Sequence, residues 1–335
     1  MFDCSKEMRN FHGDKVTLST AMREEMRERR NNGRTRLDNG LENDGHKTPA
    51  YFVQGSYAMH TMVQDDAKEF DIDDGAYFSI SALTDANGVE LTPTQAKERV
   101  RDAIRQDQRL KEPADVHDNC VRQVYPAGYH IDIPVYRIKT SKGASNNTVE
   151  IYELAAKDTW EQSDAREVTR WFFRQIDVAG DKDDGAQLRR VVRLTKSFAR
   201  SREGWAEKTG SGITLTRLVC DEFSKAPGRD DEALRKTWQA IEARLQKSRV
   251  IAHPVNTKNL AEDGDEKVGF FLDKLSEALK DLEVLDTNCT RREARASWDT
   301  TFDTTYFTRQ PTPDKRLDVD ESKADHRNDG GGVYG

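Results

Sequence analysis

The chain has 335 residues, 35% of them hydrophobic and 34% charged, with a formal net charge of −7. This length allows one large domain or two closely packed domains, and the acidic balance argues against a protein that mainly wraps nucleic acid. No apolar run approaches the roughly 18 residues of a membrane helix, and no basic-then-apolar signal segment is visible, so we expect a cytoplasmic protein without a membrane partner.

The first predicted element is a long amphipathic helix. Leu18, Met22 and Met26 recur at four-residue steps in a charge-rich background, which predicts a narrow apolar stripe. The polar, glycine-containing segment 31–47 predicts a loop. We therefore expect residues 1–47 to form an N-terminal helix and loop.

Residues 48–158 change to the pattern of strands. Short apolar or alternating runs predict strands at residues 51–54, 70–73, 121–125, 129–133 and 149–152. Between them, Thr92-Pro93 opens a predicted helix that extends to residue 107. Asp74-Gly75 directly follows the second strand run and predicts a turn.

From residue 159 to 310 the apolar residues follow a helical period instead. Three stripes predict buried helix faces at residues 188–199, 234–245 and 268–282. A set of basic residues at helical spacing predicts either one cationic face or a solvated surface: Arg189, Arg190, Arg193, Lys196, Arg200 and Arg202. Residues 311–335 combine prolines and many charges with almost no bulky aliphatic residues, which predicts a disordered C-terminal tail.

The clearest chemical pattern is a set of three aspartates, Asp71, Asp73 and Asp132. On a strand, residues i and i+2 share a face, so Asp71 and Asp73 point the same way. Aspartate is a poor strand former, and two carboxylates about 4 Å apart repel by roughly 4 kcal/mol at an effective dielectric constant near 20. Asp132 shows the same pattern, an aspartate flanked by the apolar residues Ile131 and Ile133 on a predicted strand. If its strand neighbours the first, the three carboxylates form one cluster.

Three carboxylates form the hard donor set that Mg²⁺ prefers, with Mn²⁺ as an alternative metal. Two such ions can activate an attacking hydroxyl and stabilise a leaving pyrophosphate. Upstream, Gly55 lets the backbone approach a phosphate, and Ser56 supplies a hydroxyl that can grip it. The alternative interpretation is an ordinary turn followed by carboxylates on solvated strand faces.

These residues resemble the bacterial cGAS/DncV-like nucleotidyltransferases, or CD-NTases. Gln-Gly-Ser-Tyr from residue 54, followed by Asp-Ile-Asp-Asp-Gly from residue 71, is especially similar to the cyclic GMP-AMP synthases of antiphage operons. The resemblance implies an α+β fold, in which a DNA-polymerase-β-like nucleotidyltransferase mixed sheet packs against a C-terminal, OAS-like helical domain. It implies a catalytic core at residues 48–158 and a helical domain at residues 159–310, with nucleotides held between them.

The resemblance also implies the roles of individual residues. Asp71, Asp73 and Asp132 would be both catalytic and metal-binding. Lys196 and Ser211 would hold the triphosphate, and two asparagines would lie near the base pocket. The nucleotide-binding residues implied in this way are Gln54, Gly55, Ser56, Lys196, Ser211, Asn256 and Asn259. The chain lacks the zinc-binding insertion of the animal DNA sensor, so we expect no double-stranded DNA as activator.

By the same resemblance we expect template-independent synthesis of a cyclic oligonucleotide, with cyclic GMP-AMP made from ATP and GTP as the leading product. Two alternatives remain open: linear nucleotidyl transfer to an RNA or small-molecule acceptor, and a nucleotide sensor without turnover. The aspartate set argues against the sensor, because binding alone does not require three metal ligands. In operons of the resembled family, a ubiquitin-transferase-like accessory enzyme couples the synthase C-terminus to a target. This makes Gly335 a predicted conjugation point.

Overall fold

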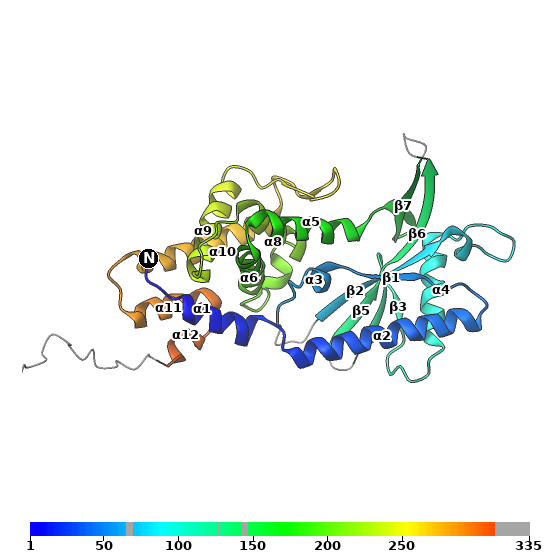
Figure 1. The fold of residues 1–335 in the computed structure, drawn as a ribbon, viewed down its shortest axis with the longest axis horizontal. Coiled ribbons are helices and arrows are strands. Elements are labelled where there is room, and N and C mark those ends of the chain that lie inside the picture. Colours follow the sequence, from blue (N-terminus) through cyan, green and yellow to red (C-terminus); the bar gives the residue numbers. More distant parts are fainter. Residues whose placement is uncertain (65–69, 126–127, 143–146, 312–335) are drawn as a thin grey trace, which may run out of the picture.

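The computed structural model describes residues 1–64, 70–125, 128–142 and 147–311. Figure 1 shows an elongated molecule in which a sheet region and a helical region lie side by side. The sheet region comprises α2 (Thr20–Asn43), β1 (Ala50–Val53), α3 (Gly55–Ala58), β2 (Phe70–Ser79), η2 (Ile80–Ala82), α4 (Pro93–Arg105), β3 (Asp115–Val116), β4 (Val121–Tyr125), β5 (Tyr129–Ile133), β6 (Val135–Lys142), β7 (Thr148–Ala156) and β8 (Thr159–Gln162).

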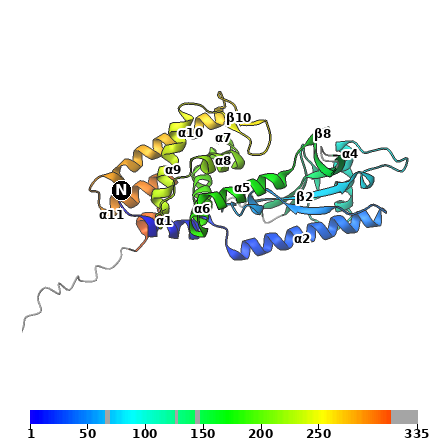
Figure 2. The same ribbon diagram turned by 45° about the horizontal axis from the view of Figure 1, so that its top comes forward.

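The helical region is built mainly from the second half of the chain, although its first helix comes from the start. It comprises α1 (Ser5–Phe11), η1 (His12–Val16), α5 (Ala165–Ala179), α6 (Lys182–Phe198), α7 (Trp205–Lys208), α8 (Gly212–Glu222), α9 (Asp230–Leu245), β9 (Ile251–Ala252), β10 (Asn259–Ala261), α10 (Glu266–Asp281), η3 (Leu282–Asp286), α11 (Arg291–Phe302) and α12 (Tyr306–Arg309). Figure 2 shows α5 running from the sheet region into the helices.

The sheet is mixed, and β2 is its central strand. The strand order is β3-β4-β5-β2-β6-β7-β8, and β1 pairs with β2 in addition. β2 is parallel to both β5 and β6, whereas the other pairs are antiparallel. The first half of β2 therefore lies beside β5, and its second half lies beside β6. This register decides which side chains of distant segments become neighbours.

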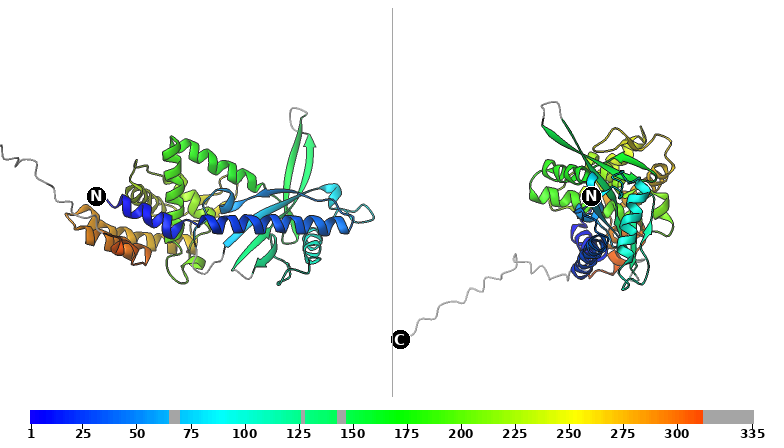
Figure 3. Two further views of the ribbon diagram at one scale, coloured as in Figure 1. Left: turned by 60° about the horizontal axis from the view of Figure 1, so that its bottom comes forward. Right: turned by 90° about the vertical axis from the view of Figure 1, so that its right-hand side faces the viewer.

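The two faces of the sheet have different environments. Ile72, Ala76 and Phe78 of β2 are buried in a core with apolar residues of α2 and α4. Figure 3 shows α2 running along the sheet. Because side chains alternate along a strand, Asp71 and Asp73 lie on the opposite face from this core. The core thus fixes the face on which the aspartates stand.

Helix α2 is longer than the sequence predicts. The segment 31–43, expected to be a loop, continues the helix to Asn43. A Cβ at Gly40 would lie 2.6 Å from the carbonyl carbon of Ala103 in α4. Glycine therefore permits α2 and α4 to approach closely, and this packing outweighs the loss of about 1 kcal/mol that an interior glycine costs a helix.

Strand β2 is also longer than predicted, so Asp74-Gly75 lies inside a strand and the predicted turn is wrong. Asp74 faces α2, where Arg34 donates to both of its oxygens at 2.7 and 2.5 Å. This buried ion pair satisfies a carboxylate that would otherwise interrupt the strand. Asp74 is therefore turned away from Asp71 and Asp73.

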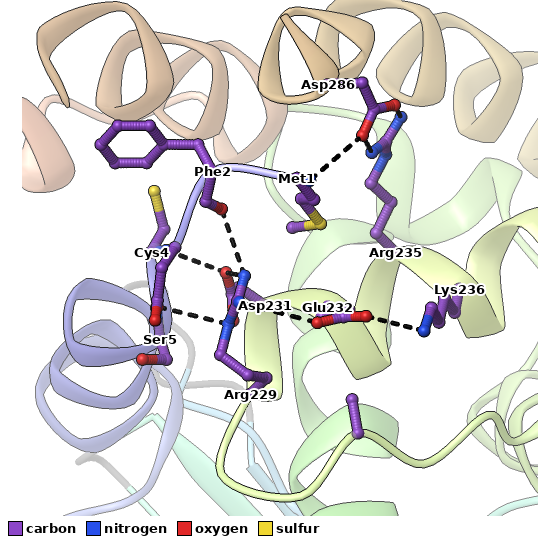
Figure 4. A network of polar contacts seen from close by, with 12 residues as sticks. Met1, Phe2, Cys4, Ser5, Arg229, Asp231, Glu232, Arg235, Lys236 and Asp286 are labelled. Carbon is purple, nitrogen blue, oxygen red and sulfur yellow. Dashed lines mark hydrogen bonds and ion pairs between the residues drawn. The ribbon is translucent and has the colours of Figure 1, made fainter. Parts of the chain in front are cut away.

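The N-terminal segment is held against the helical region rather than the sheet. The backbone N–H of Cys4 donates to Asp231 in α9 at 2.9 Å, and Arg229 donates to both oxygens of Asp231 at 3.0 and 2.9 Å. Figure 4 shows this network, with Arg235 bound to Asp286 beside it. Cys4 and the nearby apolar residues of α1 belong to the core of the helical region.

These observations confirm the predicted fold class, an α+β protein with a mixed sheet and a C-terminal helical region. The predicted strands at residues 121–125 and 129–133 have the bounds of β4 and β5, and the predicted helix from Thr92 corresponds to α4. Among the described residues, no helix is both long and apolar enough to cross a membrane.

Candidate active site

The structure brings the three predicted aspartates together on one face of the sheet. Asp73 of β2 is paired in register with Asp132 of β5, and Asp71 is paired with His130. Because the two strands are parallel and adjacent, residues paired in register project to the same side. The side chain of Asp71 is 54% exposed and that of Asp132 is 12% exposed, so the cluster lies at the edge of a solvent-accessible surface.

Asp73 lies against the Gly-Ser segment that follows β1. The backbone N–H of Gln54 donates to the carbonyl oxygen of Asp73 at 2.8 Å. Gly55 has a φ of +62°, and a Cβ built on it would overlap Oδ2 of Asp73. Glycine is therefore required here both for the backbone conformation and for the space that the carboxylate occupies. The two motifs seen in the sequence are in direct contact.

Two of the three carboxylates have basic partners. Arg122 of β4 donates to Asp132 through Nε and Nη2, each at 2.7 Å. Nε2 of His130 lies 2.5 Å from Oδ1 of Asp71, without the alignment of a hydrogen bond. Burial by itself would raise the pKa of Asp71, but the contact with His130 and the nearby positive charges hold that pKa below its usual value.

Asp73 has the opposite electrostatic environment. Its burial, together with the negative charges of Asp132 and Asp71, raises its pKa to about 6. Among the described residues, no group of three His, Cys, Asp or Glu side chains has the geometry to hold a metal ion as the side chains are placed. This agrees with the contacts above, since Asp132 is turned toward Arg122 and Asp71 lies against His130. The donor set nevertheless suits a hard cation, which would offset the repulsion that acts on Asp73.

A small cavity of about 60 Å³ connects this cluster to the helical region. Ser56 of α3, Asp71, Lys196 of α6 and Arg200 line it, together with Thr61. Nζ of Lys196 donates to the hydroxyl of Thr61 at 3.0 Å. Burial, reinforced by the charge of Arg200, lowers the pKa of Lys196 to about 7. Among the described residues the polar contacts of Nζ are with Thr61, so this buried ammonium would gain from an anion placed in the cavity.

Ser211 and Gln54 have contacts within the protein. Ser211 caps α8, where its hydroxyl accepts from the N–H of Thr214 at 3.3 Å. Its neighbour Gly212 lies close to Lys196, since a Cβ there would be 3.7 Å from Nζ. The amide of Gln54 is buried: its Nε2 donates to the hydroxyl of Tyr77 at 2.8 Å, and its Oε1 accepts from that of Tyr136 at 3.1 Å. Gln54 thus supports the segment that carries Gly55.

The predicted base-pocket residues separate in the structure. A cleft of about 1,300 Å³ lies between β7, the start of α5 and the loop 253–258, and Asn256 is among its lining residues. Asn259 is not among them, and its amide donates to Glu262 at 3.0 and 3.2 Å. In the cleft wall the guanidinium of Arg166 lies 3.7 Å from the ring centroid of Tyr152.

The basic residues between 189 and 202 do not form one cationic face. Arg190 is bound to the buried carboxylate of Asp230, and Arg193 donates to His12. Only Lys196 and Arg200 of this set reach the small cavity.

Arg122 was not predicted as a site residue, because its position depends on the register of β4 against β5. The alternation within residues 121–125 was the one available signal. Gly335 lies outside the described residues.

Comparisons with known proteins match the nucleotidyltransferase region of the chain and its overall fold. Residues 49–136 match the family model described as the nucleotidyltransferase domain of cyclic GMP-AMP synthase DncV-like proteins. A cyclic GMP-AMP synthase from Escherichia albertii is 24% identical over 233 residues, which cover 68% of this chain and 49% of that protein. The chain therefore spans about half the length of this curated relative.

Solved structures of similar proteins share the fold. The DncV cyclic AMP-GMP synthase of Vibrio cholerae, in complex with the linear intermediate 5′ pppA(3′,5′)pG, matches with a TM-score of 0.70 at 15% identity, covering 90% of this chain and 95% of that one. Escherichia coli DncV bound to 3′-deoxy GTP gives a TM-score of 0.66 at 17% identity, covering 88% and 93%. Escherichia coli MS115-1 CdnC with ATP gives 0.67 at 18% identity, covering 91% and 98%.

The family match covers the Gly-Ser segment and all three aspartates, and the matched structures share both the sheet and the helical region. Residues 49–136 are accordingly a DncV-like nucleotidyltransferase domain, and the chain that contains them is a distant homologue of a bacterial cyclic GMP-AMP synthase.

Proposed function

We propose that the protein is a metal-dependent nucleotidyltransferase that joins ribonucleoside triphosphates into a cyclic oligonucleotide, with cyclic GMP-AMP from ATP and GTP as the leading product. The observation that carries the proposal is the alignment of Asp73 with Asp132 across two parallel strands, directly beside Gly55. An ordinary solvated strand face would not need a glycine to make room for its carboxylate. The names of the matched synthases support the same reaction class.

Asp71, Asp73 and Asp132 would hold Mg²⁺, as the chemistry of three adjacent carboxylates favours. Bound there, the metal would supply a positive charge for the attacking hydroxyl and the leaving pyrophosphate. The protein's own contribution is to fix the carboxylates. Gly55 confines the space for Asp73, and the strand register places Asp132 next to it.

Lys196, Arg200 and Ser56 would bind the triphosphate at the small cavity. The pKa of about 7 means that Lys196 is largely uncharged above neutral pH until an anion arrives. A phosphate nearby would restore the proton on Nζ, so that binding creates the charge that holds the ligand. Ser211, at the N-terminus of α8 and next to Gly212, which lies close to Lys196, would contribute a hydroxyl.

The large cleft would accommodate the nucleosides. Its volume of about 1,300 Å³ exceeds the range of roughly 300–1,000 Å³ typical of pockets for one small ligand. The rings of Tyr77 and Tyr136 are stacked at 4.3 Å, and Tyr77 meets Tyr152 of the cleft at 5.8 Å. Because both Tyr77 and Tyr136 bind Gln54, this aromatic row connects the cleft wall to the segment beside Asp73.

The test is a product analysis. Purified protein is incubated with Mg²⁺ and ATP, GTP, CTP and UTP, singly and in all pairs, and products are identified by mass spectrometry. A cyclic dinucleotide that requires both ATP and GTP is the expected result. A product from one triphosphate, unchanged when a second is added, would contradict cyclic GMP-AMP, and a linear product would indicate transfer to an acceptor. The Asp73→Asn variant serves as the inactive reference. If no mixture gives more product than this variant does, the proposed enzymatic activity is contradicted.

A further inference from the structure

Asp132 is held between two charged neighbours of opposite sign. Arg122 of β4 is paired with Asp132 in the antiparallel register of β4 and β5, and Asp73 is paired with it from β2 on the other side. Both oxygens of Asp132 accept from Arg122 at 2.7 Å. The side chains of Arg122 and Asp132 are 31% and 12% exposed, so the pair is partly shielded from water.

The pair of hydrogen bonds from Arg122 to the two oxygens of Asp132, called the fork below, has two physical consequences for a cation bound by the aspartates. Two parallel N–H···O bonds fix both the position and the plane of the carboxylate, which one hydrogen bond cannot do. At the same time the guanidinium occupies lone pairs and places a positive charge next to the position where a metal would bind. The same contact therefore orients Asp132 and weakens its attraction for a free cation.

The other two carboxylates do not provide an equivalent restraint. His130 touches Asp71 without the alignment of a hydrogen bond, and the side chain of Asp71 is more than half exposed. Asp73 is confined by Gly55, but it has Asp132 as its cross-strand neighbour. On Asp132, by contrast, the fork from Arg122 engages both oxygens of the carboxylate.

We propose that Arg122 is a positioning residue that orients Asp132 for nucleotidyl transfer and keeps the nucleotide-free site weak for divalent cations, so that the metal enters together with the negatively charged triphosphate. The turnover part of this inference rests on the proposed function. The metal-affinity part does not, because it concerns the protein without nucleotide.

Two kinds of variant separate the roles. Arg122→Gln and Arg122→Met remove the charge and the fork together, whereas Arg122→Lys keeps the charge and loses the fork. Arg109→Gln is the matched control, because Arg109 makes a comparable fork with Asp107, both bonds at 2.8 Å, with an 84% exposed side chain. Mn²⁺ binding is measured by calorimetry without nucleotide, turnover is measured with MgATP and MgGTP, and thermal unfolding reports the fold.

We expect Arg122→Gln and Arg122→Met to bind Mn²⁺ about tenfold more tightly than the unchanged protein, although turnover falls roughly 100-fold. Arg122→Lys should keep the weak Mn²⁺ binding but lose turnover to a similar extent. Unchanged Mn²⁺ affinity in a folded, uncharged variant would overturn the inference, as would full turnover in Arg122→Lys. If the unchanged protein has no turnover with any triphosphate, the proposed function fails while tighter Mn²⁺ binding in the variants still supports the fork.

Discussion

The α-carbon of Gly55 faces the carboxylate of Asp73 so closely that a Cβ on Gly55 would overlap Oδ2. This relationship joins the first residue of α3, which follows β1, to a strand residue of β2. It also gives the first prediction a matched control, because Gly45 has a similar positive φ of +71° with open space around its Cβ position.

Gly55→Ala should lower turnover by about 100-fold, because Asp73 must move from its place beside Asp132. Gly45→Ala carries the same left-handed backbone strain of roughly 1–2 kcal/mol but meets no carboxylate, so it should keep nearly full turnover. Steady-state rates and thermal unfolding of both variants check this. Equal turnover losses in the two variants would show that strain, rather than the displacement of Asp73, is responsible.

Asp73→Asn should abolish turnover and yet stabilise the protein at pH 7. The folded-state pKa of about 6 lies above the ordinary aspartate value of 3.8, so ionised Asp73 costs folding free energy in full above about pH 6, and this cost disappears as the pH falls toward 4. The expected gain is roughly 2–3 kcal/mol at pH 7, shrinking toward pH 4. Denaturant unfolding at several pH values measures it.

Asp71→Asn provides the contrast within the same site. The pKa of Asp71 is held below its usual value, so its ionised form contributes stability above the unfolded pKa that is lost at lower pH. We expect Asp71→Asn to abolish turnover without the stabilisation seen for Asp73→Asn. A stability gain of equal size in both variants would contradict the opposite pKa directions.

Binding of a triphosphate at pH 8 should be accompanied by proton uptake. With its pKa lowered to about 7, Lys196 is mostly neutral at pH 8, and an adjacent phosphate restores its proton. Calorimetry of a non-hydrolysable ATP analogue, in two buffers of different ionisation enthalpy, gives the number of protons taken up. Lys196→Met should remove the uptake and weaken binding. Identical uptake in this variant would assign the proton to another group.

Asn256→Ala and Asn259→Ala should differ in their effects on KM. Asn256 is among the residues that line the large cleft, whereas the side chain of Asn259 is bound to Glu262 and is not among the lining residues. We expect the first variant to raise KM several-fold and the second to leave it within about twofold, by the cost of one lost hydrogen bond. An equal rise in KM in both variants would contradict this, because it would mean that the nucleoside also contacts Asn259.

The sequence by itself predicted a cluster of three carboxylates and the class of the fold. Alternation around residues 71–73 and 131–133 predicted strands with carboxylates on one face, because the strand repeat of two residues is a local property. Local pattern also predicted α4 from Thr92-Pro93. These elements could be predicted without knowing which other elements they pack against. Their residues also resemble the family whose nucleotidyltransferase domain matches residues 49–136.

Tertiary structure decided what each residue touches. The polar, glycine-containing segment 31–47 predicted a loop, but close packing of Gly40 on α4 keeps residues 31–43 helical. Asp74 was predicted to be a turn residue, but it lies inside β2. Its carboxylate accepts a hydrogen bond there from Arg34, which is 40 positions away in the sequence. Arg122 became a partner of Asp132 only through strand register. Strand register and helix packing are set by the free energy of burying many side chains that are distant in the sequence. A short segment of sequence therefore does not determine them.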